Sequence, residues 1–336
     1  MMSKGKSEFR ISSSRSLTTT PVFDAYWHFA YERQEILFRR LNGEVPPWTE
    51  DQILKEYRFT NVYRASDRVS QYLIRHVIYE GIQSEEEVFF RTILFRLFNN
   101  ITTWKLIESK LGPISWRTFK LEKWDRLLWD ELHAGRKIYS AAYIMPSPAF
   151  GEARKHSNHL RLLASMMKDR IPMRVAASRS LGEVFHILRS CPSLGDFLAF
   201  QFSIDLNYSP LINFSEMDFV VAGPGARSGI RKAFANTCGL GAEDVIRAVA
   251  EFADREFNKR GLQFRSLWGR SLQLIDCQNL FCEVDKYSRV AFPKLIGSGR
   301  TRIKQRFLPK PSPLVQWYPP KWGLQPRAIS STCLSF

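Results

Sequence analysis

The sequence predicts an all-α fold, and three observations lead to that prediction. Apolar residues recur at the three- and four-residue spacing of amphipathic helices through most of the chain. Strand-like alternation of apolar and polar residues is scarce, and no internal repeat of roughly 20–50 residues is found. With 336 residues, 44% of them hydrophobic and 24% charged, the chain has an ordinary globular composition. That length allows one large domain or two closely packed ones.

Helices can be assigned in chain order from this spacing. The first twenty residues are charged and rich in hydroxyls, and they predict a disordered leader. A helix then runs from Phe23 to Leu41 and ends at an Asn-Gly pair. Thr49 followed by Gln52 has the pattern of a capping box and predicts the start of a short second helix. Further helices are predicted over residues 67–79, 85–98, 104–111, 116–132, 136–145, 154–168, 181–189, 194–206 and 242–260.

A domain boundary is expected near Pro146-Ser-Pro148, between two groups of helices. The chain is therefore interpreted in four parts. These are a leader (1–20), an N-terminal helical lobe (21–148), a second lobe (149–295) and a basic, proline-rich C-terminal tail (296–336). Six prolines between positions 309 and 326 disfavour regular helix in that tail.

Positive charge is concentrated at the C-terminal end. The chain has 49 Lys and Arg against 33 Asp and Glu, a formal charge of +16. No acid follows Lys286, so the end of the chain carries ten of these charges without compensation. Such a field favours a polyanion, above all nucleic acid, as the partner. The alternative is a basic surface that only keeps the protein soluble. The ten residues are Lys286, Arg289, Lys294, Arg300, Arg302, Lys304, Arg306, Lys310, Lys321 and Arg327.

The sequence also argues against several classes of protein. It contains no run of 18 apolar residues and no apolar signal segment at its N-terminus, so we expect a cytoplasmic protein. Five cysteines without a CxxC pair predict free thiols instead of disulfides, a zinc site or an iron–sulfur cluster. His156 and His159 have no obvious third ligand, so we expect no metal. No phosphate-binding loop of the GxxxxGK[ST] type is present, and no cofactor is predicted.

The most distinctive local feature is Gly223-Pro-Gly225, which we expect to lie between two helices. It resembles a helix-hairpin-helix motif, in which backbone N–H groups and a helix N-terminus face a DNA phosphate. The alternative is a plain interhelical turn. The candidate DNA-binding residues are the glycines and the cations and small residues that follow, together with two cations further along: Gly223, Gly225, Ala226, Arg227, Ser228, Arg231, Lys232, Lys286 and Arg289.

A segment downstream resembles the catalytic segment of the helix-hairpin-helix DNA glycosylases. Val284-Asp285, followed by Arg289-Val290, matches the skeleton around their catalytic aspartate, although the Thr-His pair of that segment is missing. The resemblance makes Asp285 the candidate catalytic residue, with Asp205 and Asp276 in reserve. It also implies a monofunctional enzyme, because Arg227 stands where bifunctional members have a lysine nucleophile. The alternative is an Asp285 that is only paired with a cation such as Arg289 in a helix turn.

A second resemblance covers residues 23–290. It rests on Phe23-Asp-Ala-Tyr26-Trp27, Glu32-Arg33, Pro47-Trp48-Thr49, Arg58-Phe-Thr-Asn61-Val-Tyr-Arg64, Asp67-Arg68, Asp205-Leu-Asn-Tyr208-Ser209 and Gly223-Pro-Gly225-Ala226. These segments resemble the helical domain of the 5-hydroxymethyluracil DNA kinases. That family is similar to phage thymine pyrophosphorylases and to a bacterial anti-phage glycosylase.

This resemblance implies a two-lobed, helix-hairpin-helix glycosylase-like fold that acts on double-stranded DNA containing a modified pyrimidine. The flipped base would enter a pocket of polar and aromatic side chains. The candidate pocket residues are Trp48, Asn61, Arg64, Asp67, Arg68, Gln201, Asp205, Asn207 and Tyr208.

Three functional hypotheses remain open at this point. The first is a DNA glycosylase, an N-glycosyl hydrolase that excises a hypermodified pyrimidine and leaves an abasic site in defence against phage. The second is a transferase or pyrophosphorylase that modifies 5-hydroxymethyluracil-type bases in DNA. The third is a non-catalytic reader of modified DNA.

Overall fold

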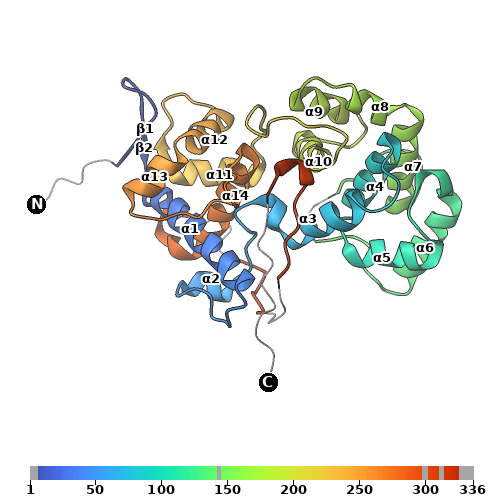
Figure 1. The fold of residues 1–336 in the computed structure, drawn as a ribbon, viewed down its shortest axis with the longest axis horizontal. Helices are drawn as coiled ribbons and strands as arrows, with labels where there is room; N and C mark the ends of the chain where they lie inside the picture. The colour runs from blue at the N-terminus through green and yellow to red at the C-terminus, as the bar shows by residue number, and fades with distance from the viewer. Residues whose placement is uncertain (1–6, 142–144, 297–301, 310–313, 325–336) are drawn as a thin grey trace, which may run out of the picture. The chain divides into compact units, whose positions relative to one another are not determined.

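A computed structural model describes residues 7–141, 145–296, 302–309 and 314–324, and these are mainly helical (Figure 1). The prediction of a mainly helical protein is confirmed. The chain divides into two compact units. Unit 1 comprises Met1–Asp67, Val220–Gln316 and Gly323–Phe336, and unit 2 comprises Arg68–Phe219 and Trp317–Trp322. This division differs from the boundary expected near Pro146, because the N-terminal segment packs with the C-terminal third of the chain.

Unit 1 holds the long first helix and the helices that follow residue 220. Its elements are β1 (Glu8–Arg10), β2 (Ser16–Thr19), α1 (Pro21–Leu41), α2 (Gln52–Glu56), η1 (Arg64–Ser66), α11 (Pro224–Ala233), β3 (Phe234–Asn236), α12 (Ala242–Glu251), α13 (Ala253–Lys259), α14 (Leu274–Ala291) and α15 (Pro293–Ile296).

A small sheet in unit 1 corrects the prediction of a disordered leader. Strand β2 pairs antiparallel with β1 on one side and with β3 on the other. Phe9 on β1 is fully buried, and its ring lies 5.1 Å from that of Phe23 and 6.2 Å from that of Phe234. The strands are too short to produce a visible alternation in the sequence. Pairing with β3, more than 200 residues away, and packing of Phe9 on Phe23 and Phe234 make residues 8–19 an ordered part of the fold.

Helices α11 and α14 pack closely because α11 carries glycine at two positions four residues apart. A Cβ at Gly225 would lie 2.4 Å from the Sγ of Cys282, and one at Gly229 would lie 2.1 Å from the backbone oxygen of Phe281. These two glycines therefore permit close helix packing. The expected helix-hairpin-helix is not formed among these residues. Residues 208–223 contain no helix, and Gly223 is the N-cap of α11.

Unit 2 is organised around α4. Its elements are α3 (Arg68–Tyr72), the π-helical η2 (Leu73–Ile78), α4 (Glu85–Phe98), α5 (Ile101–Leu111), η3 (Trp116–Thr118), α6 (Leu121–His133), α7 (Lys155–Lys168), α8 (Ile171–Ala176), α9 (Leu181–Arg189), α10 (Asp196–Asn207) and η4 (Pro320–Trp322).

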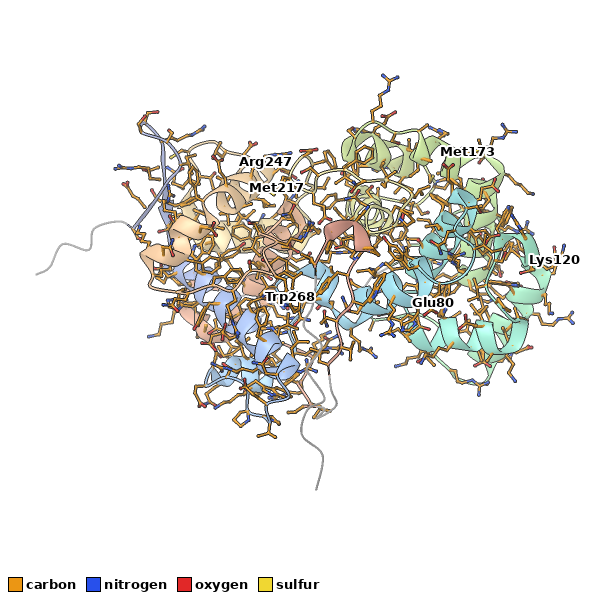
Figure 2. All side chains as sticks on the ribbon, viewed as in Figure 1. Glu80, Lys120, Met173, Met217, Arg247 and Trp268 are labelled. Atoms are coloured by element: carbon orange, nitrogen blue, oxygen red, sulfur yellow. The ribbon has the colours of Figure 1, made fainter. Side chains whose placement is uncertain are left out.

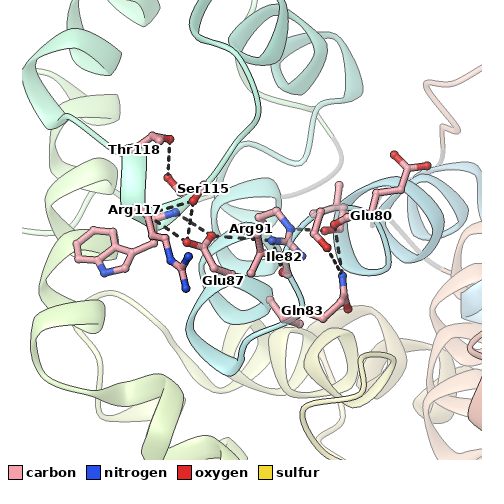
Figure 3. Close-up of polar contacts among 12 residues, drawn as sticks. Glu80, Ile82, Gln83, Glu87, Arg91, Ser115, Arg117 and Thr118 are labelled. Carbon is pink, nitrogen blue, oxygen red and sulfur yellow. Dashed lines mark hydrogen bonds and ion pairs between the residues drawn. The ribbon is translucent and has the colours of Figure 1, made fainter.

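Two charged side chains of α4 are buried and bind the loops beside it (Figure 3). The Glu87 carboxylate accepts hydrogen bonds from the Ser115 hydroxyl at 2.7 Å and from the Arg117 backbone N–H at 3.2 Å. The Arg91 guanidinium donates to the carbonyl oxygens of Val77 and Ile82, both at 2.8 Å. Each charge is thus compensated by hydrogen bonds, as burial requires.

Most predicted helices are confirmed, and three segments differ. The described part of 136–145 contains no helix, 116–132 is a short 3-10 turn followed by α6, and 242–260 is broken at Phe252 between α12 and α13. Asp51, and not Thr49, caps α2.

Side-chain packing holds the long loop before α14 against α1. The ring of Trp268 in this loop (Figure 2) packs edge-on against the ring of Phe38 of α1, with 5.7 Å between the ring centroids.

The described parts of the C-terminal tail are integrated into the fold. In unit 1, the Arg58 N–H donates to the carbonyl of Gln305 at 3.0 Å, and the Phe307 N–H donates to that of Glu56 at 2.9 Å. In unit 2, the Lys321 ammonium donates to two backbone carbonyls at 2.6–2.8 Å. Some of the charges expected to face a polyanion therefore have internal partners. Arg300, Lys310 and Arg327 lie outside the described residues.

Candidate nucleic-acid interface

The candidate catalytic Asp285 lies on α14 and faces α11. Its carboxylate accepts a hydrogen bond from Ser228 Oγ at 2.6 Å and pairs with Lys232 Nζ at 2.8 Å and with Arg289 Nη2 at 2.6 Å. Arg289 lies one turn further along α14, while Ser228 and Lys232 project from one side of α11. The ion pair with Arg289 that the sequence left as an alternative is therefore present.

The environment of Asp285 favours its charged form. Burial by itself would raise the pKa of the carboxyl group. Hydrogen bonds from Lys232, Ser228 and Arg289 outweigh that effect and bring the pKa below its ordinary value of 3.8. Asp285 is therefore a weak base, and its direct effect is to orient two cations. With two cations to one anion the cluster carries net positive charge, and both cations are partly exposed.

The other candidate DNA-binding residues differ in their availability. Arg227 is half exposed and pairs with Glu243 at 2.6 Å, and Lys286 pairs with Glu283 at 2.7 Å. Arg231 is exposed and has no partner among the residues that the structure describes. Ala226 is buried against the fold. Arg231 is thus the cation of α11 most accessible to an external anion.

A buried polar network connects the N-terminal candidates to α1. The Asn61 N–H donates to Asp67 Oδ1 at 2.7 Å, and Asn61 Oδ1 accepts from Arg33 Nη2 at 2.8 Å. The Arg64 N–H donates to Asp276 at 2.8 Å. Asp276 also forms the capping box of α14, so this reserve candidate has a structural role.

Asp67 has a more basic carboxylate than Asp285. Burial raises its pKa to about 6, and the charge of Glu283 adds to this effect. The Asn61 N–H, Arg33 and Arg64 oppose the increase. Its second carboxylate oxygen has no hydrogen-bond partner within the described ranges. Asp67 therefore suits proton transfer near neutral pH better than Asp285 does.

Trp48 lines a mostly apolar cavity of about 360 Å³ in unit 1. Four aromatic side chains contribute to its walls. The Trp48 indole N–H donates to the carbonyl of Glu44 at 2.6 Å, which fixes the ring. The lining residues are Arg33, Ile36, Pro46, Pro47, Trp48, Thr49, Leu54, Lys55, Tyr57, Phe59, Phe307 and Pro309.

The four pocket candidates on or after α10 are placed in the core of unit 2. Gln201, Asp205, Asn207 and Tyr208 are all at least 98% buried. Asp205 pairs with both Nε and Nη2 of Arg96 at 2.7 Å, and Asn207 bonds in both directions to the backbone of Phe214. These side chains complete the packing of α10, and their assignment to the base pocket stays a prediction. Arg68, at the start of α3, is exposed.

The two histidines of α7 are internal. His159 bonds to the hydroxyl of Tyr139 at 2.7 Å and to the Pro146 carbonyl at 2.9 Å. Burial lowers its pKa to about 4. His156 lies 3.2 Å from Asp125, beside a polar hollow of about 420 Å³ between α6 and α7 whose charged side chains mostly pair with each other. Both histidines are thus buried side chains with partners inside the protein.

Comparison with known proteins decides the family. Residues 20–297 match the family described as "5-hmdU DNA kinase, helical domain". The chain belongs to this family. A 5-hmdU DNA kinase from Bacillus phage SP10 is 25% identical to it over 294 residues, which cover 80% of this chain and 45% of the phage protein. The chain thus spans less than half the length of this curated relative. No solved structure matches it.

Family membership corrects the enzymatic prediction. Expecting a monofunctional glycosylase, a hydrolase, was wrong, because the family and the phage relative are named for a kinase, which is a transferase. The error arose because a short sequence match around Asp285 was taken as evidence for the whole glycosylase mechanism.

No helix of the described residues is long and apolar enough to cross a bilayer.

Sequence reasoning identified only Trp48 among the residues that line the cavity, and it missed Arg33 and Phe307 among the others. Arg33 lies on the buried face of α1, and a charge among apolar positions was the signal that could have identified it. Phe307 belongs to the tail and reaches the cavity only through backbone pairing with residues 56–58. No local pattern encodes that pairing.

Proposed function

We propose that this chain binds DNA containing 5-hydroxymethylpyrimidine bases and presents the modified base for transfer of a group to its 5-substituent. The observation that carries the proposal is the family match over residues 20–297, which extends through both units. The domain would supply DNA recognition, and a nucleotide would supply the transferred group. The sequence contains no GxxxxGK[ST] loop, so the nucleotide would bind through residues other than such a motif.

The α11–α14 surface supports phosphate contact in this proposal. Arg231 is open to solvent, and the first-turn N–H groups of α11 favour an anion. Asp285 acts as a positioning residue that keeps the Lys232 and Arg289 side chains on this surface. Such contacts bind the DNA backbone without reading its sequence.

Binding and transfer can be measured in one experiment. The protein is titrated with two duplexes that differ only in one 5-hydroxymethyluracil or thymine, and fluorescence anisotropy reports binding. The DNA is then incubated with nucleoside triphosphate and analysed by mass spectrometry. Tighter binding to the modified duplex with a mass increase on its base supports the proposal. Preference without a mass change indicates a reader alone, and equal binding to both duplexes contradicts recognition of the modified base.

A pair of variants tests the phosphate surface. Arg231→Ala should weaken binding to both duplexes equally and reduce the slope of log affinity against log salt by about 1. Lys259→Ala removes another exposed cation, at the end of α13, and should change neither value. An unchanged slope in Arg231→Ala would remove α11 from the interface.

A further inference from the structure

The cavity beside Trp48 has the properties of a site for one nucleobase. We propose that it holds a single unstacked pyrimidine of the bound DNA, with oxygen atoms of the base accepting hydrogen bonds from Arg33. This inference rests on the proposed function and specifies where the modified base is placed. Three features of the cavity support it: its walls, the Arg33 guanidinium and its charge.

The walls favour a flat, mainly apolar ring. The cavity volume of about 360 Å³ lies in the range of small-ligand sites, and Trp48, Tyr57, Phe59 and Phe307 provide aromatic surface. The Trp48 and Phe307 rings lie 6.3 Å apart, edge to face. Aromatic side chains bind unstacked bases of any sequence, because every base offers a π-face.

Arg33 supplies hydrogen-bond donors that the protein leaves unused. The side chain is about 91% buried and lines the cavity. Its Nε donates to the Thr60 carbonyl at 3.0 Å and its Nη2 to Asn61 at 2.8 Å. The other N–H groups of the guanidinium have no acceptor within the described parts of the chain. These N–H groups are available to an acceptor in the cavity, and a 5-hydroxymethyluracil offers a ring carbonyl and a hydroxyl oxygen side by side.

Two further cations lie at or beside the cavity, and positive charge there favours an anionic nucleotide. The Arg40 guanidinium lies over the Trp48 ring at 5.1 Å, and no acid of the described residues pairs with it. Lys55 lines the cavity as well, and its ammonium group pairs with the highly exposed Glu50. A neutral apolar ligand would gain nothing from these charges.

The site is continuous with the candidate DNA surface along α14. Phe59 of the cavity lies 6.1 Å, ring to ring, from Tyr287, and Lys286 Nζ lies 4.4 Å from the centre of the Phe59 ring. Both residues are within two positions of Asp285 on α14. Phe307, which closes one wall, lies beyond residue 297, where the family match ends.

The test uses the full chain and a duplex with 2-aminopurine beside a single 5-hydroxymethyluracil. Extrusion of the modified base unstacks the 2-aminopurine and increases its fluorescence. Trp48→Ala and Phe307→Ala should each reduce affinity about 5- to 150-fold, the range for loss of one stacking ring, and suppress the fluorescence increase. Leu308→Ala changes the exposed neighbour of Phe307 and should behave as the wild type. Arg33→Lys should reduce the preference for 5-hydroxymethyluracil over thymine.

The outcomes separate this proposal from the one on which it rests. Circular dichroism melts first establish which variants are folded. Phe307 is only partly buried, so Phe307→Ala should disturb the fold least. Wild-type affinity and fluorescence in folded Phe307→Ala and Trp48→Ala would overturn the base pocket and leave DNA recognition intact. Failure of the wild type to prefer modified DNA would defeat the proposed function. In that case, quenching of tryptophan fluorescence by free 5-hydroxymethyl-2′-deoxyuridine that is lost in Trp48→Ala would support the pocket, and its absence in the wild type would overturn it.

Discussion

The close packing of α11 on α14 leads to a stability prediction that can be worked from atomic distances. In Gly229→Ala the new Cβ would meet the Phe281 backbone oxygen at 2.1 Å, so the two helices must separate by roughly 1 Å. Overpacking of this kind costs about 1–3 kcal/mol and occasionally more, against a gain of about 1 kcal/mol in helix propensity. Because the obstacle is backbone, we expect the free energy of unfolding to fall by about 2 kcal/mol.

A second glycine provides the matched comparison. In Gly225→Ala the obstacle is the side chain of Cys282, at 2.4 Å, so it can be removed by mutation. Cys282→Ala should rescue most of the stability lost in Gly225→Ala and none of that lost in Gly229→Ala. The assay is urea denaturation followed by circular dichroism, with double-mutant cycles for the coupling. Wild-type stability in Gly229→Ala, or equal rescue of both variants, would refute the packing argument.

Three further predictions concern buried charges. Asp285→Asn should lower the free energy of unfolding at pH 7 by about 1–3 kcal/mol, because two partly buried cations lose their anion. Since the folded pKa of Asp285 lies below its ordinary value, this contribution should disappear as the pH falls below about 4, where wild type and variant converge in urea melts. Asp67→Asn should show the opposite trend. The pKa of Asp67 is raised to about 6 in the folded state, so ionisation is harder there than in the unfolded chain. The wild type should therefore lose stability relative to the variant as the pH rises from about 4 to about 6, and parallel curves would contradict this. Asp205→Ala should cost about 3–5 kcal/mol by leaving the Arg96 charge buried, whereas a loss of DNA affinity without loss of stability would return Asp205 to the binding site.

The polar candidate residues show which contacts local sequence can predict and which require the tertiary structure. A cluster of polar residues on one helix is equally consistent with a binding pocket and with an internally satisfied core. Asp205 and Arg96 are 109 residues apart, so only packing shows that they pair. The pairing of Asp285 with Arg289 lies within one helix turn and could be anticipated from spacing.

The sequence by itself determined the helical character, most helix boundaries, the absence of a local phosphate loop and the family resemblance, because these properties depend on short-range periodicity and on residue identity. Tertiary structure decided which residues share a site. In the folded protein β2 pairs with β1 and β3, and Phe307 lies at the cavity beside Trp48. Gly225 and Gly229 of α11 pack against α14. Each of these contacts joins residues far apart in the chain. Their energies depend on shape and burial that no local window of sequence contains.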